Sequence, residues 1–488
     1  MTTRFDAIVI GTGQAGPSLA RRLAQSGMKV AVIERAKFGG TCVNTGCIPT
    51  KTMVASARAA HVARRAADFG VDVAGAVAVD MRRVKARKDA ISGASSHGVE
   101  SSLRGTANCT VYQEQARFES AHEISVGSER LAADRIFINV GGRAVIPDIS
   151  GLQNVSYLTN SSMMDVDFLP RHLAILGGSY VGLEFGQMFR RFGSEVSIIE
   201  AGPRLMPRED EDIANGMKEI FEAEGIQIHL NTRCAAVLPS RDRGHTTSVA
   251  SREGAVFQAD ALHLTLENLG ATKELSASHL LLATGRRPNT DDLGLEAAGI
   301  VTDKRGYIVV DDQLRTSIPG VWALGDCNGK GAFTHTSYND YEIVAANLLD
   351  NDPRRVTDRI EAYNVYTDPP LGRVGMTETQ VRQTGRPALI ATRPMTHVGR
   401  AVEKGETQGF MKILVDAESK AILGAAILGV EGDEAIHCIL DVMYARKPYT
   451  TIQRAVHIHP TVSELIPTLL GDLKPLTGGT IPSHSTGS

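Results

Sequence analysis

Short apolar runs, each bounded by glycines or charges, predict the buried strands of an α/β protein. FDAIVI at residues 5–10 and KVAVIE at residues 29–34 flank a segment of helical character that ends at about Gln25. Continuous apolar runs of this length are typical of parallel strands that are covered on both faces. Two such strands joined by one helix form a βαβ unit, so the chain is predicted to begin with a parallel sheet.

The same pattern occurs a second time. LAIL precedes Gly177 and EVSIIE ends at Glu200, which lies 23 residues after Gly177, just as Glu34 lies 23 residues after Gly11. Two motifs with the same internal spacing indicate a repeat. The chain is therefore predicted to hold two dinucleotides, one in each βαβ unit.

The glycines of the first unit have separate roles in such a fingerprint. In GTGQAG, Gly11 permits the tight turn, Gly13 lets the backbone approach a pyrophosphate, and Gly16 lets the helix pack closely on the strand. Glu34, at the end of the second strand, is placed to accept a hydrogen bond from a ribose hydroxyl. Strand, loop, helix and acid together predict a dinucleotide site.

The second unit departs from this pattern at one position. It contains Gly177, Ser179 and Gly182, so a serine stands where the fingerprint has its second glycine. A hydroxymethyl group is tolerated there if the pyrophosphate lies slightly higher. Glu200 favours NADH because a carboxylate repels the extra phosphate of NADPH, whereas the nearby arginines leave NADPH open: Arg204 and Arg208.

The rest of the chain divides by pattern. Residues 50–105 are predicted to be mainly helical, and residues 110–140 and 226–284 rich in strands. The polar stretch from about Pro239 to Gln258 is predicted to be a hairpin or loop and is assigned no function. Residues from about 355 to 475 form an α/β segment without a nucleotide fingerprint, and the small, polar last residues are predicted to be disordered.

Composition limits the classes of function. A net charge of −3 and a pI near 6.5 argue against a nucleic-acid partner. The sequence begins without a signal peptide and has no apolar run long enough to span a membrane, which predicts a cytoplasmic protein. Six cysteines in 488 residues are too few for a disulfide scaffold. In a reducing compartment a close cysteine pair is more often catalytic than structural.

One such pair lies in GGTCVNTGCIPTK, residues 39–51. Residues at i and i+5 of an ideal helix are roughly 7.5 Å apart along the axis, which is too far for a disulfide. Cys42 and Cys47 can therefore bond only if the segment between them is not regular helix. Pro49 suits a first helical turn, where the helix dipole favours a thiolate, and Lys51 adds a positive charge one turn after Cys47.

A second chemical signal is HIHPTVSE at residues 457–464. Pro460 holds His459 extended and is predicted to begin a helix at its first position. Glu464, on that helix, is placed to turn back and hold one imidazole nitrogen. Such a contact fixes the tautomer, as a general acid–base histidine requires.

These motifs resemble those of the class I pyridine nucleotide–disulfide oxidoreductases, the family of dihydrolipoamide dehydrogenase, glutathione reductase and mercuric reductase. GGTCVNTGCIPTK matches the family's redox-active segment, and HIHPTVSE is similar to its HxHPTxxE motif. LLATGRRPNT, residues 281–290, and GVWALGDCNG, residues 320–329, resemble its ATGRxPN segment and its second FAD fingerprint. The resemblance covers roughly residues 5–475.

The resemblance implies an α/β fold with two Rossmann-like dinucleotide-binding domains, one for FAD and one for NAD(P), followed by a C-terminal α/β dimerisation domain. The implied boundaries are 1–150 and 285–354 for the FAD domain, 151–284 for the NAD(P) domain, 355–475 for dimerisation and 476–488 for a disordered tail. It implies an obligate homodimer in which each active site is built from two chains.

The resemblance also implies the site residues. Cys47 contacts the flavin, Cys42 exchanges with substrate, and His459, oriented by Glu464, moves the proton. Lys51 and Glu184 match a pair near the flavin ring, and the remaining positions match cofactor contacts: Gly11, Gly13, Gly16, Glu34, Gly40, Thr41, Thr284, Gly285, Gly325, Asp326 and His335 for FAD, and Gly177, Ser179, Tyr180, Gly182 and Glu200 for NADH or NADPH. No resident metal is implied.

The electron acceptor stays open. A small-molecule or protein-borne disulfide, as in a dihydrolipoamide dehydrogenase-like enzyme, agrees with the complete pair of His459 and Glu464. A mercuric reductase-like activity agrees with the phrasing around Cys42, but the last cysteine is Cys438 and no cysteine pair follows it. A third alternative keeps the fold as a slow redox sensor.

Overall fold

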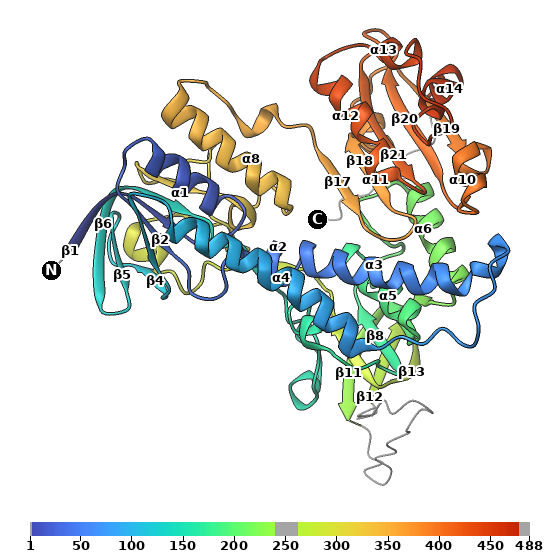
Figure 1. Cartoon of the computed structure of the whole chain (residues 1–488), viewed down its shortest axis with the longest axis horizontal. Coiled ribbons are helices and arrows are strands. Elements are labelled where there is room, and N and C mark those ends of the chain that lie inside the picture. The colour runs from blue at the N-terminus through green and yellow to red at the C-terminus, as the bar shows by residue number, and fades with distance from the viewer. Residues whose placement is uncertain (1, 240–261, 478–488) are drawn as a thin grey trace. The chain divides into compact units, whose positions relative to one another are not determined.

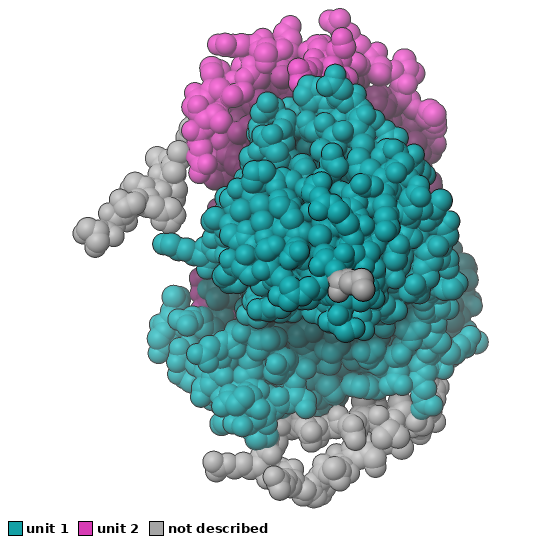
Figure 2. Space-filling view, turned by 90° about the vertical axis from the view of Figure 1, so that its left-hand side faces the viewer, with its two compact units in different colours: residues 1–201, 232–359 teal, residues 202–231, 360–488 magenta. Residues whose placement is uncertain are grey.

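The computed structural model describes residues 2–239 and 262–477. The chain forms two compact units, the first built from Met1–Ala201 with Thr232–Arg359 and the second from Gly202–Asn231 with Ile360–Ser488 (Figure 2). The polar stretch predicted beyond Pro239 and the tail from residue 478 lie outside the described residues. The domain boundaries implied by the family resemblance stay a prediction.

The first unit contains the predicted parallel sheet. Its parallel strands lie in the order β3-β2-β1-β6-β16, with a β4–β5 hairpin antiparallel to the first half of β6. Helix α1 crosses from β1 to β2 and ends at the predicted residue (Figure 1). The bounds are β1 Thr2–Ile10, α1 Gly16–Gln25, β2 Val30–Ile33, β3 Cys109–Tyr112, β4 Ala116–Phe118, β5 Glu123–Val126, β6 Glu129–Ile138 and β16 Val321–Ala323.

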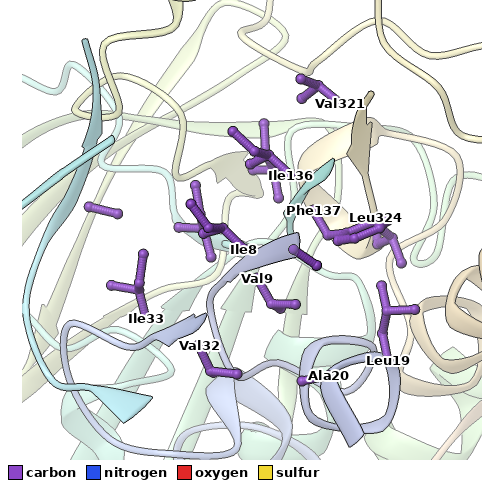
Figure 3. Close-up of a cluster of buried hydrophobic side chains, with 14 of the residues drawn as sticks. Ile8, Val9, Leu19, Ala20, Val32, Ile33, Ile136, Phe137, Val321 and Leu324 are labelled. Carbon is purple, nitrogen blue, oxygen red and sulfur yellow. The ribbon is translucent and has the colours of Figure 1, made fainter. Parts of the chain in front are cut away.

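The core of this sheet consists of the apolar runs that predicted it. Ile8 and Ile136 are fully buried on one face of the sheet, and Val9 and Val32 are fully buried on the other face, the side on which Leu19 of α1 lies (Figure 3). Burying one such side chain contributes about 1.5–3 kcal/mol. Strands covered on both faces position their carboxyl ends firmly, and the loops that follow those ends carry the predicted site.

The second βαβ unit repeats the first. Strands β9, β8 and β14 are parallel in that order, and α5 joins β8 to β9. An antiparallel sheet β11-β12-β13 accounts for the strands predicted before residue 284. The bounds are β8 His172–Leu176, α5 Tyr180–Phe192, β9 Glu195–Ile199, β11 Thr232–Pro239, β12 Leu262–Asn268, β13 Ala271–Ala277 and β14 His279–Leu282.

Helices between the first two strands and β3 carry the cysteine segment. They are α2 Gly40–Asn44, α3 Cys47–Arg64, the 3-10 helix η1 Ala66–Phe69 and α4 Met81–Arg104. The predicted helical region is thus interrupted between η1 and α4, where glycines and alternating valines do not sustain a helix. Helix α3 packs against both α4 and α5 (Figure 1).

The remaining elements of the first unit connect its sheets and pack on them. Strand β7 Gly142–Ala144 pairs with β15 Arg286–Pro288, and the 3-10 helix η4 Gly325–Asn328 follows β16. Helix α8 Thr334–Ala345 then packs against α1. The short elements η2 Leu152–Asn154, η3 Ser162–Asp165, α7 Leu295–Ala298 and η5 Ala346–Asp350 lie in connecting segments, as does η6 Val356–Asp358.

The second unit is an antiparallel sheet in the order β17-β18-β21-β20-β19-β22, with helices packed on it. The strands are β17 Ala362–Val365, β18 Leu371–Gly375, β19 Ala388–Pro394, β20 Phe410–Asp416, β21 Ile422–Leu428 and β22 Lys474–Pro475. The other elements are α6 Glu211–Ala223, β10 Gln227–His229, α9 Glu378–Gln383, η7 Met395–His397, α10 Gly399–Glu403, α11 Gly432–Ala435, α12 His437–Tyr444, α13 Thr450–Gln453 and α14 Leu465–Gly471.

Buried ion pairs fix the start of α6 to this sheet. Arg373 on β18 donates to Glu209 at 2.5 Å, and Lys412 on β20 lies 2.7 Å from Asp212 and 3.0 Å from Asp210. Both cations are about 1 % exposed. A buried charge costs several kcal/mol unless it is paired, so this cluster determines how the segment packs on the sheet.

Across both units, no helix in the described residues combines the length and the apolar character that a membrane crossing requires.

Candidate active site

The first glycine loop follows β1 and leaves no room for side chains. Gly11 has φ +97°, and a Cβ placed on it would lie 2.3 Å from the carbonyl oxygen of Asn139. A Cβ on Gly16 would lie 2.3 Å from the carbonyl oxygen of Gly11. Contacts this short do not occur, so both positions require glycine, as the fingerprint predicts.

Glu34 holds the first loop from the end of β2. Its carboxylate accepts hydrogen bonds from the Thr12 backbone nitrogen at 3.0 Å and from the Thr12 hydroxyl at 2.6 Å. The Thr12 hydroxyl in turn accepts from the Gly39 nitrogen at 3.2 Å. The acid predicted to bind a ribose therefore also joins the glycine loop to the start of the cysteine segment, where a Cβ on Gly40 would lie 2.9 Å from the Cα of Gly13.

Asn139, at the end of β6, is a site residue that the sequence analysis missed. Its Oδ1 accepts from the Gly16 nitrogen at 3.0 Å, and its Nδ2 donates to the Leu324 carbonyl at 2.9 Å. The same Oδ1 would lie 2.7 Å from a Cβ on Gly13. A polar residue directly after the buried run IFI was the available signal, since carboxyl ends of parallel strands form ligand sites.

The second glycine loop has the same backbone contacts. Gly177 has φ +111°, and its Cβ would lie 2.3 Å from the carbonyl oxygen of Ala283. A Cβ on Gly182 would lie 2.0 Å from the Gly177 carbonyl. Glu200 accepts from the Gly178 nitrogen at 2.7 Å, at the place in the loop that Thr12 occupies in the first unit. Ser179 is the N-cap of α5.

The segment that resembles a second FAD fingerprint, residues 320–329 and called the second flavin segment below, contains β16 and the 3-10 helix η4. The Gly325 nitrogen donates to buried Asp340 at 2.7 Å. The Asp326 carboxylate lies 4.0 Å from the Arg286 guanidinium, and burial raises the pKa of Asp326 although Arg286 opposes this shift. Gly325 also lies beside Asn139, because its Cβ would be 2.9 Å from that Nδ2. The segment therefore meets the first glycine loop through one amide side chain.

Thr284 and Gly285 follow β14 and lie against β7. The Thr284 hydroxyl donates to the Val145 carbonyl at 3.4 Å, and the Val145 nitrogen donates to the Gly285 carbonyl at 3.0 Å. Both residues are exposed. Gly285 has φ +132°, a conformation that favours glycine.

Three aromatic side chains contact one another, and two of them are stacked. The Tyr180 ring lies 5.8 Å from the Phe333 ring, which is parallel to the His335 ring at 5.6 Å. Tyr180 begins α5 of the second βαβ unit, which belongs to the first compact unit, and burial raises the pKa of Tyr180. Phe333 therefore contacts two predicted cofactor residues, Tyr180 and His335.

The cysteine pair lies on two separate helices. Cys42 is in α2, Cys47 is the first residue of α3, and the chain between them leaves helical geometry at Thr45 and Gly46. This is the irregularity that the spacing required. The two side chains hydrogen-bond to each other, so the thiols are close enough to interact although they are unpaired in this structure.

Charge is divided unequally between the two sulfurs. The hydrogen bond from Cys42 lowers the pKa of Cys47 to about 6, and Thr334 and Lys51 act in the same direction. The same mutual hydrogen bond, together with burial, raises the pKa of Cys42, although Thr334 and Lys51 oppose this shift. The Thr334 hydroxyl, 3.0 Å from the Cys47 sulfur, was also missed by the sequence analysis.

Lys51 and Glu184 meet as the family resemblance implies. The Lys51 nitrogen lies 2.7 Å from the Glu184 carboxylate, whose side chain is 6 % exposed. Lys51 belongs to α3 and Glu184 to α5, so this ion pair links the cysteine helix to the second nucleotide unit. Because Lys51 lies one helical turn after Cys47, its positive charge acts on both sulfurs.

His459 and Glu464 also meet, but on a different local structure from the predicted one. His459 Nδ1 is 3.0 Å from both carboxylate oxygens. The prediction that Pro460 begins a helix was wrong: α14 begins at Leu465, with Glu464 as its N-cap. Thr461 forms a turn instead, accepting from the Glu464 nitrogen and donating to the Ile458 carbonyl.

The other four cysteines have no chemical partner that suggests a role. Burial raises the pKa of each thiol, to about 12 for Cys327 and to about 11 for Cys234 and Cys438. Thiols with raised pKa values are poor nucleophiles at neutral pH. Among the described residues no group of histidine, cysteine and acidic side chains is arranged to hold a metal ion.

Two family profiles cover most of the chain. That of the pyridine nucleotide-disulphide oxidoreductases matches residues 5–340, and that of their dimerisation domain matches residues 362–470. The chain belongs to this family. It is a flavin-dependent NAD(P)H disulfide oxidoreductase and carries the family's dimerisation domain.

Particular relatives extend over nearly the whole chain. The probable pyridine nucleotide-disulfide oxidoreductase RclA of Escherichia coli K12 is 36% identical over 96% of this chain and 100% of its own. A mercuric reductase of Streptomyces lividans is 32% identical over 95% of each chain. A dihydrolipoyl dehydrogenase of Thermus scotoductus is 31% identical over 94% of this chain and 95% of its own.

Solved structures agree with this assignment. The HOCl-induced flavoprotein disulfide reductase RclA from Escherichia coli matches with a TM-score of 0.84 and 34% identity, over 96% of this chain and 99% of that one. Its Cu(II) complex matches with a TM-score of 0.83, over 95% and 99%. The glycine loops after β1 and β8, each held by a glutamate at the end of the next strand, fit the two nucleotides that the family uses, a flavin and a pyridine nucleotide.

Proposed function

We propose that this protein transfers electrons from NADH to a disulfide through FAD and the Cys42–Cys47 pair. The arrangement of the two sulfurs supports this proposal most directly. They lie on separate helices, share a hydrogen bond and have pKa values shifted in opposite directions. Two structural cysteines have no need of such an arrangement, whereas a dithiol that opens and closes does.

FAD is assigned to the first glycine loop and the second flavin segment, and NADH to the second loop. Bound FAD would supply the carrier that takes two electrons from the nicotinamide and passes them to the disulfide. Gly13 would let the backbone approach its pyrophosphate, Gly11 and Gly16 would keep the loop and helix close enough for this, and the N-terminus of α1 favours that negative charge. Glu200 supports NADH over NADPH, because its carboxylate would face the additional phosphate.

The chain's own groups perform the thiol chemistry. Two electrons and one proton convert the disulfide to a Cys47 thiolate and a Cys42 thiol. Cys42 then loses its proton to a base and attacks one sulfur of the substrate disulfide, which releases the other sulfur as a thiolate. The Cys47 thiolate displaces the second substrate sulfur from Cys42 and restores the enzyme disulfide.

His459 is the proposed base, contributed by the other subunit of a homodimer. Its side chain is 80 % exposed while Glu464 is 15 % exposed. Glu464 accepts from Nδ1–H, so Nε2 is the nitrogen that accepts the Cys42 proton and later returns it. A histidine that is orientated by a carboxylate and yet exposed on its own chain suits a site on a second copy. A cytoplasmic location remains a prediction of the sequence.

The acceptor is proposed to be a small-molecule or protein-borne disulfide such as lipoamide. A metal-ion acceptor is a second candidate, because a related flavoprotein is known as a Cu(II) complex and another relative is a mercuric reductase. Two adjacent thiols also suit a soft metal ion. A slow redox sensor is the third, and negligible turnover with every acceptor would favour it.

Anaerobic NADH oxidation with lipoamide, in parallel with Cu(II) and with Hg(II) plus excess thiol, tests this proposal. Cys42→Ser is expected to abolish disulfide turnover and to leave flavin reduction by NADH intact. Cys109→Ser, a substitution of a half-buried thiol on β3, is the matched control and should keep both. Disulfide turnover that survives Cys42→Ser would contradict the mechanism, and reduction of metal ions alone would transfer the assignment to the second candidate.

A further inference from the structure

One peptide group of the second flavin segment is held by side chains at both ends. It joins Leu324 to Gly325, between β16 and η4. The Leu324 carbonyl oxygen accepts from Asn139 Nδ2 at 2.9 Å, and the Gly325 nitrogen donates to the Asp340 carboxylate at 2.7 Å. Asn139 follows β6 and Asp340 belongs to α8. Two elements other than β16 therefore determine the direction of this peptide group.

The same peptide group comes directly before Asp326. Gly325 has φ +73°, a left-handed conformation that favours glycine, and Asp326 follows it in η4. Because a peptide group is planar, fixing its direction leaves only the dihedral angles of Gly325 to determine where Asp326 begins. The two hydrogen bonds thus affect the direction of the carboxylate that the family resemblance assigns to FAD.

Asp340 binds both ends of η4 with one oxygen. Its side chain is buried, and its Oδ2 accepts from the Gly325 nitrogen and, at 3.0 Å, from Asn328 Nδ2. Gly325 is the first residue of η4 and Asn328 is the last. A carboxylate is a stronger acceptor than a neutral oxygen. Asp340 therefore holds the short helix that carries Asp326.

Arg359 compensates the charge of this buried carboxylate. Its Nη2 donates to Asp340 Oδ1 at 2.5 Å, and its Nε donates to Asn339 Oδ1 at 2.9 Å. A buried carboxylate without a cation is strongly unfavourable, and the pyrophosphate of FAD would add further negative charge nearby. The pairing lets Asp340 stay charged, and hence a strong acceptor, beside an anionic cofactor.

We propose that Asp340 is a positioning residue for FAD and that Arg359 is the partner that keeps it effective. Asp340 acts through Gly325 and Asn328 and not by contact with the cofactor. The inference rests on the proposed function in one respect, namely that Asp326 binds FAD. Local sequence pattern could not reveal this role, because Asp340 is 15 positions from Gly325 and 19 from Arg359.

The test is the dissociation constant of FAD, measured by diluting the holoenzyme and following the fluorescence of released flavin. Asp340→Ala removes the acceptor of both donors and should raise this constant by about tenfold to a hundredfold. Asp340→Asn keeps one acceptor oxygen but turns an amide donor toward Arg359, and it should raise the constant by about tenfold. Adding Arg359→Met to Asp340→Asn should return it to within about threefold of wild type.

Glu342→Gln is the matched control. Glu342 lies on the same helix and accepts from Asn339 at 2.9 Å instead of binding η4, so this variant should bind FAD like the wild type. Visible circular dichroism of the bound flavin should change in Asp340→Ala and stay unchanged in Glu342→Gln, while far-ultraviolet spectra show that both are folded. An equal loss of FAD in Glu342→Gln would mean that any charge change on α8 suffices, and would contradict the proposal.

Two further results would overturn it. One is a wild-type dissociation constant in folded Asp340→Ala. The other, which decides the question if Asp340→Ala does not fold, is a double variant that binds FAD no better than Asp340→Asn alone.

Asp326→Ala separates this inference from the proposed function. It should also raise the dissociation constant of FAD, because it removes the carboxylate that Asp340 is proposed to position. Weaker binding in Asp326→Ala with unchanged binding in Asp340→Ala would refute the inference alone. Unchanged binding in Asp326→Ala would refute the assignment of FAD to this segment, whereas the thiol chemistry is tested separately by the turnover of Cys42→Ser.

Discussion

The two glycine loops have nearly the same backbone but different neighbours. In both, a Cβ on the first glycine would lie 2.3 Å from a strand-end carbonyl oxygen, and in both a glutamate accepts from the loop backbone. The residue that provides that carbonyl is Asn139 in the first βαβ unit and Ala283 in the second βαβ unit. Asn139 extends an amide into the loop, whereas Ala283 has no group that reaches so far.

This difference explains the serine that departs from the fingerprint. Gly13 faces the Asn139 amide, whose oxygen would lie 2.7 Å from its Cβ. At the matching position the second βαβ unit has Ser179, and its strand-end residue is Ala283, which carries no amide that could crowd a hydroxymethyl group. The second glycine of the motif is therefore required by the protein's own strand-end side chain as well as by the ligand.

The largest effect is expected from alanine at the third glycine of each loop, which should impair nucleotide binding at one site and leave the other site intact. Gly16→Ala and Gly182→Ala each place a Cβ within 2.3 Å of a carbonyl oxygen, and overpacking of this kind costs about 1–3 kcal/mol, or roughly tenfold to a hundredfold in affinity. Gly16→Ala should lose flavin absorbance at purification. Gly182→Ala should retain flavin and lose its reduction by NADH. Loss of flavin from both variants would contradict two independent cradles.

Exchanging the strand-end partner tests the explanation of Ser179. Gly13→Ser should weaken flavin retention because it crowds Asn139, and Asn139→Ala should weaken it because Gly16 and Leu324 lose their partners. The double variant has the residue types of the second βαβ unit, serine in the loop and alanine at the strand end. Its loss of flavin-binding free energy should be smaller than the sum of the two single losses by about 1 kcal/mol. Flavin release in urea, followed by fluorescence, measures this coupling. Additive effects would contradict it; Ser179→Gly should change little.

Breaking the ion pair between Lys51 of α3 and Glu184 of α5 should have the next smaller effect, on the free energy of unfolding. Lys51→Met leaves the nearly buried Glu184 carboxylate without this cation, which should cost about 1–3 kcal/mol of stability. Equilibrium unfolding in urea, monitored by flavin and by tryptophan fluorescence, measures the loss. Lys37→Met, at an exposed position, is the control and should be within about 0.5 kcal/mol of wild type. Equal stability of the two variants would mean that the pair contributes nothing.

The smallest effect is expected on the preference between NADH and NADPH when the charge of Glu200 is removed. Glu200→Gln keeps an acceptor for the Gly178 nitrogen but removes the charge, so NADPH should gain about fivefold to tenfold in kcat/KM relative to NADH. Steady-state kinetics with both nucleotides measure the ratio. Glu195→Gln, an exposed carboxylate at the start of the same strand, should leave it unchanged. A constant ratio in Glu200→Gln would move nucleotide selection elsewhere, with Arg204 and Arg208 as the candidates.

Local pattern was sufficient for much of this architecture. Both βαβ units, the end of α1 at Gln25 and the break before Cys47 follow from apolar runs and from glycine placement. Contacts between distant segments were beyond its reach: Asn139 meets Gly16 across 123 positions, and Thr334 meets Cys47 across 287. The helix expected at Pro460 failed because the Thr461 turn uses the backbone groups that a first helical turn would engage.

The shortness of the cysteine segment has a consequence for the lifetime of the protein. A disulfide between Cys42 and Cys47 would close a loop of only six residues, so it would restrict the unfolded chain by about 2 kcal/mol. For a chain of 488 residues this corresponds to a melting-temperature difference of only a few degrees. Even so, about 2 kcal/mol is roughly a thirtyfold change in the unfolded fraction, so the reduced form should be degraded more readily than the oxidised form and each cycle of electron transfer should alter how long the molecule persists.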